Sequence, residues 1–229
     1  MASPHGYFIT GTDTGVGKTA VTLGLMQLLQ ERGHRVAGMK PVASGCELTA
    51  RGLRNGDAVR LRQQASIELA YEAVNPYAFE PPIAPHLAAA RAGCRIDLET
   101  IHAGVQQLAR QTDRVCVEGI GGWLVPLNGR ETVADLAVRL GLGIILVVGI
   151  RLGCLNHALL TVRAIEAAGL ELAGWVANIL PPPPGNAEDS INCLKTMTYA
   201  PLLGVVPVLP DVSAMGVAAC LSLQALENS

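Results

Sequence analysis

A glycine-rich turn with one lysine and one threonine holds the residues best suited to chemistry in this sequence. The turn runs from Gly11 to Thr19 and lies between an apolar run and a helical pattern of leucines. In that setting the glycines allow several backbone N–H groups to converge on one point, where the start of a helix adds positive potential. Lys18 would reach the β- and γ-phosphates of a nucleotide, and the Thr19 hydroxyl would bind a magnesium ion. The turn therefore predicts a nucleoside triphosphate site, against the simpler alternative of a tight turn with an incidental lysine.

A second lysine and a carboxylate follow two further apolar runs. Lys40 comes directly after Val36–Met39. Such a lysine is often a solvated strand end, but beside a triphosphate its charge would stabilise phosphoryl transfer. Glu118 follows Val115–Val117, where a buried carboxylate is costly unless it meets a cation. Because magnesium accompanies a bound triphosphate, we expect Glu118 to help hold that ion.

Two other polar residues keep two interpretations each. Asp57 could be a second carboxylate for the metal ion or the N-cap of a helix. Ser44 could donate to a substrate carboxylate or only stabilise the turn after Lys40. The histidines show no metal spacing, so we expect no zinc site.

Composition indicates a globular protein with an aliphatic core. Of the 229 residues, 50% are hydrophobic and only 3% aromatic, and the formal net charge is −2 without a basic run. We therefore expect no nucleic-acid partner. The longest strongly apolar run, Ile144–Val148, is too short to span a bilayer, and we expect no secretory leader. Six cysteines without a C-x-x-C pair suit reduced core thiols in a cytoplasmic protein better than extracellular disulfides.

Apolar β-branched runs alternate with helical patterns, which is typical of parallel strands joined by crossover helices. We predict strands over Tyr7–Gly11, Arg35–Met39, Arg114–Glu118, Gly143–Ile150, Leu172–Asn178 and Leu202–Val206. We predict helices over Lys18–Arg32, Asp97–Gln111, Thr132–Leu140, Leu155–Ala168, Ala187–Met197 and Val212–Leu226. Together they predict a single α/β domain over residues 1–229, with a doubly wound, mostly parallel sheet flanked by helices.

In such a sheet, ligands bind beyond the carboxyl ends of the strands. The phosphate loop, Lys40, Glu118 and Asn178 each follow or end a predicted strand. We therefore expect residues that are far apart in the sequence to meet in one crevice.

Several motifs make the sequence resemble the dethiobiotin synthetases, ATP-dependent enzymes that act before the last step of biotin synthesis. The motifs run in order over nearly the whole chain, and several have no explanation as general features of a phosphate loop. They are Gly11–Thr14 with Val16–Thr19, Lys40–Gly45, Leu53–Asn55 with Asp57, Val74–Tyr77, Val117–Gly119 with Gly121–Trp123, Leu152–Cys154 with Asn156–Ala158, Gly174–Asn178 and Ala200–Gly204. The resemblance implies a P-loop NTPase domain.

The resemblance also implies a reaction. Such enzymes convert 7,8-diaminononanoate, CO2 and ATP into dethiobiotin, ADP and phosphate through a carbamate and a carbamic phosphate. Lys18 and Lys40 would be catalytic, and Thr19, Asp57 and Glu118 would hold Mg2+. The implied nucleotide-binding residues are Gly15, Val16, Gly17, Lys18, Thr19, Ala20, Asp57, Glu118, Gly119, Ile120, Gly121, Asn178, Pro207, Val208 and Leu209. The implied substrate-binding residues are Thr14, Lys40, Ser44, Gly153, Cys154, Leu155 and Asn156.

A homodimer is the assembly that the resemblance implies. Residues 153–156 would open a helix and bind the substrate of the neighbouring subunit across a two-fold interface. The alternative is that Asn156 merely caps its own helix.

Three positions depart from the expected patterns. Thr12 stands where the strict phosphate-loop pattern has glycine, Gly15 where some relatives have an acidic residue, and Ile179 where an aspartate is common. The last difference leaves the selectivity for adenine open. Two other functions compete: a partitioning-type ATPase switch, which typically carries a lysine at the position of Asp13, and an inactive nucleotide-binding regulator.

Overall fold

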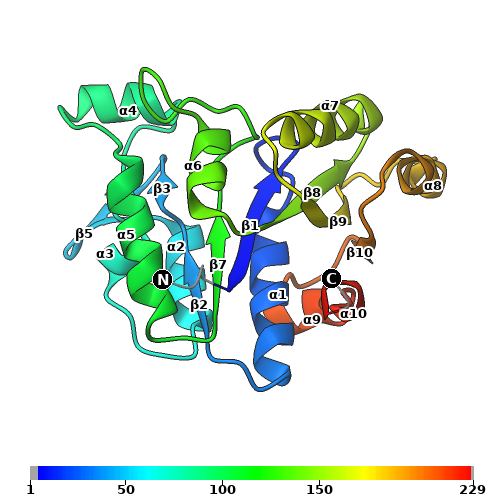
Figure 1. The fold of residues 1–229 in the computed structure, drawn as a ribbon, viewed down its shortest axis with the longest axis horizontal. Helices are drawn as coiled ribbons and strands as arrows, with labels where there is room; N and C mark the ends of the chain where they lie inside the picture. The colour runs from blue at the N-terminus through cyan, green and yellow to red at the C-terminus, as the bar shows by residue number, and fades with distance from the viewer. Residues whose placement is uncertain (1–4, 228–229) are drawn as a thin grey trace.

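Six parallel strands form the central sheet of the protein (Figure 1). The computed structural model describes residues 5–227, so the ends of the domain expected over 1–229 lie outside the described part. The strand order is β10-β9-β8-β1-β7-β2, as in a doubly wound fold. The strands are β1 (Gly6–Gly11), β2 (Val36–Met39), β7 (Arg114–Glu118), β8 (Gly143–Ile150), β9 (Leu172–Ile179) and β10 (Leu202–Val206). Each predicted strand is confirmed to within one residue at either end.

Helices cover both faces of this sheet. Gly38 in β2 faces Met26 and Leu61, whereas the next residue, Met39, lies against Gly104. Because adjacent residues of a strand point to opposite faces, the contacts of Gly38 lie on one side of the sheet and the contact of Met39 lies on the other. The helices concerned are α1 (Lys18–Glu31) and α2 (Gly56–Gln64) on one side and α5 (Leu98–Ala109) on the other. The other long helices are α6 (Val133–Leu140), α7 (Cys154–Ala167) and α8 (Ala187–Met197).

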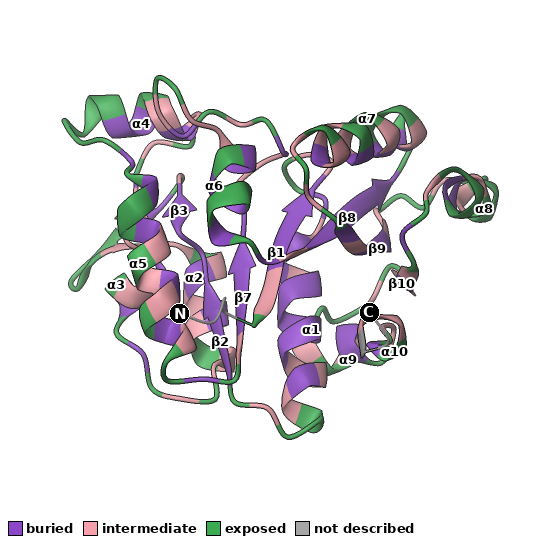
Figure 2. Cartoon of the chain, viewed as in Figure 1, coloured by how far each residue is buried: buried purple, intermediate pink, exposed green. Residues whose placement is uncertain are grey.

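The hydrophobic core is centred on β1, which pairs with β7 and β8 on its two sides. Phe8 in β1 is opposite Val117 in β7 and Ile144 in β8, and all three side chains are fully buried. Figure 2 shows this burial along β1, β7 and β8, with the exposed residues on the outer sides of α7 and α8. Burial on both faces explains why these strands read as continuous apolar runs in the sequence. None of the helices in residues 5–227 is long and apolar enough to cross a membrane.

The segment between β2 and α5 contains structure that the sequence did not predict. It forms two small sheets, one of β3 (Val42–Ala43) with β6 (Tyr77–Ala78) and one of β4 (Glu47–Thr49) with β5 (Gly52–Arg54). It also contains α2, α3 (Tyr71–Val74) and α4 (Pro85–Arg91). These elements are short or polar, so they show too few apolar residues to reveal a period.

The predicted helix over Val212–Leu226 is wrong. The chain forms the short helices α9 (Ala214–Ala218) and α10 (Gln224–Glu227), and the residues between them run beside β10. There Ser222 donates its N–H to the carbonyl of Leu203 at 2.8 Å, and Leu221 forms an isolated antiparallel bridge with Gly204. A pairing with the free edge of β10 therefore interrupts the helix, and a helical period alone cannot reveal such a tertiary contact.

Candidate active site

The phosphate loop joins β1 to α1 as the sequence predicted. Gly15 and Gly17 have φ values of +74° and +92°, in the left-handed region that favours glycine. A Cβ atom at Gly17 would collide with the amide nitrogen of Asn178, so this position also needs glycine for space. That amide donates to the carbonyl of Val16 at 2.9 Å and holds the loop from the end of β9.

Lys18 extends from the first residue of α1 back across the loop. Its ammonium donates to the carbonyls of Asp13 at 2.8 Å and Gly121 at 2.6 Å, and its side chain is buried. Burial, together with the nearby charge of Lys40, lowers the pKa of Lys18 to about 8. An anion in the loop would favour the charged form of this lysine.

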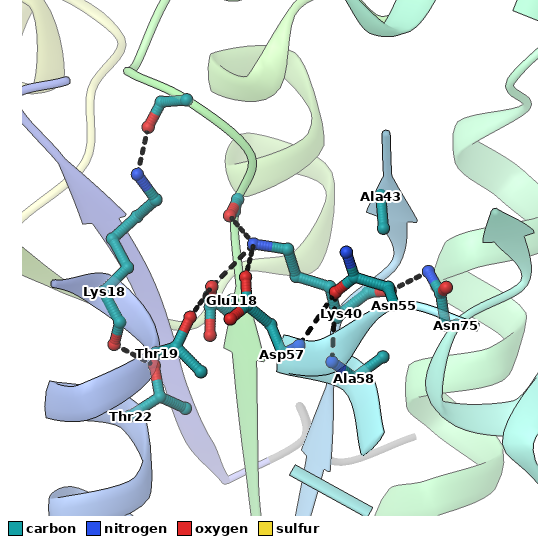
Figure 3. Close-up of polar contacts among 12 residues, drawn as sticks. Lys18, Thr19, Thr22, Lys40, Ala43, Asn55, Asp57, Ala58, Asn75 and Glu118 are labelled. Atoms are coloured by element: carbon teal, nitrogen blue, oxygen red, sulfur yellow. Dashed lines mark hydrogen bonds and ion pairs between the residues drawn. The ribbon is translucent and has the colours of Figure 1, made fainter. Parts of the chain in front are cut away.

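Glu118 at the end of β7 connects α1 with the second lysine (Figure 3). Its Oε1 atom accepts hydrogen bonds from the ammonium of Lys40 at 2.6 Å and from the hydroxyl of Thr19 at 2.8 Å. Lys40 also donates to the carbonyl of Gly119 at 3.0 Å. Glu118 and Lys40 are 1% and 5% exposed, so the two buried charges compensate each other.

Asp57 joins the same cluster from α2. Its carboxylate lies 3.8 Å from the ammonium of Lys40 and is 43% exposed. The alternative that Asp57 caps the helix is wrong, because Asn55 is the N-cap and its side chain accepts hydrogen bonds from the N–H groups of Asp57 and Ala58. The carboxylate of Asp57 is therefore not engaged in capping, and Asp57 lines the cleft.

A buried hydrogen-bond network positions both Lys40 and α2. Asn75 donates its amide to the carbonyl of Lys40 at 2.7 Å and accepts from the hydroxyl of Tyr71 at 2.9 Å. The same hydroxyl accepts from the N–H of Asn55, the N-cap of α2, at 2.7 Å. Burial raises the pKa of Tyr71, which keeps the phenol protonated as a donor. In the sequence Asn75 stands out only as part of a family motif, and no pattern there indicates the role of Tyr71.

Lys18, Lys40, Asp57 and Glu118 line one cleft of about 740 Å³ at the carboxyl edge of the sheet. It contains most of the predicted phosphate-loop, lysine and carboxylate residues, together with Ser44. The predicted residues that line it are Thr14, Gly15, Gly17, Lys18, Thr19, Ala20, Lys40, Ser44, Asp57, Glu118, Ile120 and Gly121. The expectation that distant parts of the chain meet in one crevice is confirmed.

Other predicted residues lie at the same edge without lining this cleft. Val16 belongs to the phosphate loop, and its side chain is buried. The carbonyl of Gly119 accepts a hydrogen bond from Lys40. Asn178 supports the loop, and Pro207–Leu209 follow β10. Residues 153–156 begin α7, where Cys154 is buried and Asn156 is exposed. Gly153 is the N-cap and no side chain caps this helix, so the alternative that Asn156 caps it is wrong.

The structure adds lining residues that the sequence analysis did not name. Arg60 comes from α2, Val125 from the loop after β7, and Pro82, Ile83, Ala84 and Pro85 form an apolar wall before and at the start of α4. The proline-rich stretch was the available signal, but its place beside the phosphate loop depends on tertiary structure.

The oxygen atoms around Glu118 suit a magnesium ion. Oε2 of Glu118 is buried and has no hydrogen-bond partner among residues 5–227, which leaves one carboxylate oxygen open for a cation. The described residues contain no group of three or more histidine, cysteine, aspartate or glutamate side chains suited to a metal ion. Magnesium usually takes one or two protein carboxylates and completes its shell with phosphate and water oxygens, so this set fits it.

A parallel sheet with this loop after its first strand defines the class of P-loop nucleotide-binding proteins. Residues 5–216 match the AAA_26 family, described as an AAA domain. MinD from Aquifex aeolicus in its complex with MinC shares the fold with a TM-score of 0.56 and 17% identity, covering 98% of this chain and 89% of that one. MinD from Pyrococcus horikoshii, solved with Mg-ADP, has a TM-score of 0.53 and 20% identity, with coverages of 98% and 90%.

Much higher identity links the chain to one group of enzymes. The ATP-dependent dethiobiotin synthetase BioD of Pseudomonas paraeruginosa is 53% identical over 221 residues, covering 96% of this chain and 97% of that one. BioD 1 of Escherichia coli K12 is 48% identical over 213 residues, with coverages of 92% and 95%. The chain belongs to the dethiobiotin synthetase family.

Proposed function

We propose that the protein uses ATP to close 7,8-diaminononanoate and CO2 into dethiobiotin, with release of ADP and phosphate. The observation that carries this proposal is the meeting of Lys18, Lys40, Thr19, Asp57 and Glu118 in one cleft. Its relatives at about half identity are named for this activity. The proposal also explains why two lysines, rather than one, face a phosphate-binding loop.

The reaction proceeds in three balanced steps. One amine of the substrate adds to CO2 and loses a proton to give a carbamate. A carbamate oxygen takes the γ-phosphoryl group of ATP, and ADP leaves. The second amine then attacks the carbamic phosphate carbon and loses a proton, and phosphate leaves as the ureido ring closes.

The two lysines have different roles in this scheme. Lys18 binds the β- and γ-phosphates from the first residue of α1, where the helix N-terminus adds positive potential. Lys40 approaches from the neighbouring strand and stabilises charge on the transferred phosphoryl group and on the carbamate. Its ion pair with Glu118 gives the buried ammonium a compensating charge inside the protein.

Magnesium is the cofactor that we assign to the cleft. Thr19, Asp57 and Glu118 would hold it, and when bound it would neutralise charge on the phosphate oxygens. The open Oε2 of Glu118 supports this assignment.

The remaining assignments concern orientation of the two substrates. Thr14 and Ser44 line the cleft and would donate to the diamine substrate. Nucleotide binding would be completed by Val16, Ala20, Gly119–Gly121 and, on the base side, Asn178 with Pro207–Leu209. Because the amide nitrogen of Asn178 already donates to Val16, its carbonyl oxygen is the atom left to accept from the base.

A homodimer would complete the substrate site with residues 153–156 of a second subunit. Leu152, just before α7, and Leu160, in the middle of that helix, are 97% and 62% exposed, and Met197 and Tyr199, at and just after the end of α8, are also exposed. One two-fold interface that covered these apolar residues together with residues 153–156 would place Asn156 near the partner's cleft. A cytoplasmic location is supported by six free cysteines.

An ATPase assay with and without diaminononanoate and bicarbonate tests the function. We expect ATP turnover to require the diamine, and mass spectrometry to show a product equal to diamine plus CO2 less water. A partitioning-type switch would hydrolyse ATP without the diamine, and an inactive regulator would not hydrolyse it. ATP turnover without the cyclic product would overturn the proposed function.

A further inference from the structure

Arg60 is a cation in the cleft that the assignments above leave unused. It lies on α2 one turn after Asp57, so the two side chains share a helix face. Both line the same cleft as Lys18 and Lys40.

The guanidinium of Arg60 links two separate parts of the chain. Its Nη2 atom donates to the carbonyl of Val212 at 3.0 Å. Val212 lies in the loop over 207–213, which follows β10 and belongs to no helix or strand. Because Pro207–Leu209 are proposed to bind the base, this hydrogen bond connects the metal side of the cleft with its base side.

The guanidinium of Arg60 has unused N–H donors and a positive charge with which it could bind an anion. Within residues 5–227 Arg60 makes no ion pair, and its hydrogen bond to Val212 occupies one of several N–H donors in a fixed fork. The charged cleft-lining residues are three cations, Lys18, Lys40 and Arg60, and two carboxylates, Asp57 and Glu118. The two carboxylates lie with Lys40, so the charge of Arg60 has no compensating partner in the cleft.

We propose that Arg60 is a nucleotide-binding residue that fastens the 207–212 loop to α2 and donates its remaining N–H groups to an oxygen atom of bound ATP. The inference rests on the proposed placement of ATP in this cleft. A guanidinium suits the task because one rigid group serves a carbonyl and an anionic oxygen together, whereas a lysine ammonium lacks the planar fork.

The test measures binding of the magnesium complex of a non-hydrolysable ATP analogue by calorimetry, and KM for ATP. Arg60→Ala should raise both Kd and KM by about fivefold, because contacts between exposed charges are screened by solvent and contribute little. The kcat at saturating ATP and the KM for the diamine should stay within about twofold, because uniform nucleotide binding is what is lost. Arg60→Lys should recover only part of the affinity.

Arg62→Ala is the matched control. Arg62 is on the same helix and also donates to a backbone carbonyl, that of Leu69 at 2.6 Å, but it does not line the cleft. We expect this variant to bind nucleotide like the wild type. An equal loss in both variants would show a general effect on α2 and would overturn the proposal.

The variant Lys18→Ala distinguishes a wrong role for Arg60 from a wrong location of the nucleotide. If Lys18→Ala loses the analogue while Arg60→Ala binds it normally, the cleft binds nucleotide and the role of Arg60 is wrong. If both variants bind like the wild type, the nucleotide is not in this cleft, and the proposed site fails together with the inference.

Discussion

The ammonium of Lys40 lies 2.6 Å from Oε1 of Glu118, and the hydroxyl of Thr19 donates to the same oxygen at 2.8 Å. One carboxylate oxygen therefore serves the second lysine and the phosphate-loop threonine, while Oε2 stays open. A magnesium ion at Glu118 would share the carboxylate with Lys40. The charge of the lysine and the position of such an ion would thus be coupled through a single side chain.

Lys40→Gln tests the role of the second lysine. The glutamine keeps a donor but no charge, so we expect kcat to fall by on the order of a hundredfold or more, as when one preorganised donor to a transition state is lost. Nucleotide affinity should be largely kept, because Lys18 remains. Steady-state kinetics and calorimetry measure the two quantities, and a wild-type kcat in this variant would disprove the assigned role.

Glu118→Gln tests the metal site with little change in side-chain volume. Loss of the carboxylate charge should weaken the magnesium-dependent part of nucleotide binding and abolish turnover, because the ion loses a ligand. Asp57→Ala should have the same effect in a milder form. Titrations of nucleotide affinity against magnesium concentration measure both variants.

Asn55→Ala is the control for these metal variants. It removes the side chain that caps the backbone of α2 but leaves every proposed ligand carboxylate in place, and should cost about 1 kcal/mol of unfolding free energy. Its magnesium dependence should be that of the wild type. If Asp57→Ala behaves like Asn55→Ala, losing stability but keeping turnover at low temperature, Asp57 is not a metal ligand.

Mixing two inactive variants tests the shared site of the proposed dimer. Lys18→Ala damages the phosphate loop, and Asn156→Ala damages the segment proposed to reach the partner. If each site combines both subunits, a mixed dimer holds one doubly damaged site and one intact site, so activity should return on subunit exchange. A mixture that stays inactive after exchange has been verified would place Asn156 outside the partner's site.

The start of α6 predicts a pH dependence of stability. Thr132 and Asp135 form a capping box, and the hydrogen bonds from the hydroxyl and N–H of Thr132 lower the pKa of Asp135. Because its pKa is lower in the folded state, ionised Asp135 stabilises the folded protein at pH values above the pKa of the unfolded state. This stabilisation is lost as the pH falls through the pKa of the folded state. Asp135→Asn should therefore be less stable by about 0.5 kcal/mol near neutral pH, as expected for the charge of an exposed carboxylate in a first helical turn.

This difference should begin to shrink below about pH 4 and should vanish once the pH has fallen through the lowered pKa of Asp135, where the wild-type carboxyl is also neutral. Urea unfolding across that range measures it. Turnover should be unaffected, because no residue of 133–140 lines the cleft. A difference that persists unchanged at low pH would show that charge on Asp135 is not the cause.

The main sheet was predictable because its strands are buried on both faces and read as apolar runs. The bounds of β7, β8 and β10 agree at both ends with the sequence prediction. The cluster of Lys18, Lys40 and Glu118 followed from the rule that strand ends meet at one edge. Asp57 could not be resolved, because Asn55 and Asp57 are both suitable caps and the choice depends on where α2 begins.

Tertiary contacts account for what the sequence did not reveal. Tyr71 and Asn75 gain their role by hydrogen bonds to backbone atoms of residues far away in the chain, and those atoms exist in every residue. The break between α9 and α10 depends on the free edge of β10. Neither kind of partner has a signature in residue type or spacing.

The network of Asn55, Tyr71 and Asn75 has a consequence for protein engineering. The hairpin of β4 and β5 lies between two anchored points, the N–H of Cys46 on the carbonyl of Phe79 at 2.9 Å and the N–H of Asn55 on Tyr71 at 2.7 Å. Its tip at residues 50 and 51 is exposed. Because lengthening a loop between fixed ends costs little free energy, the tip is a suitable attachment point for a dye or an inserted peptide beside a working active site.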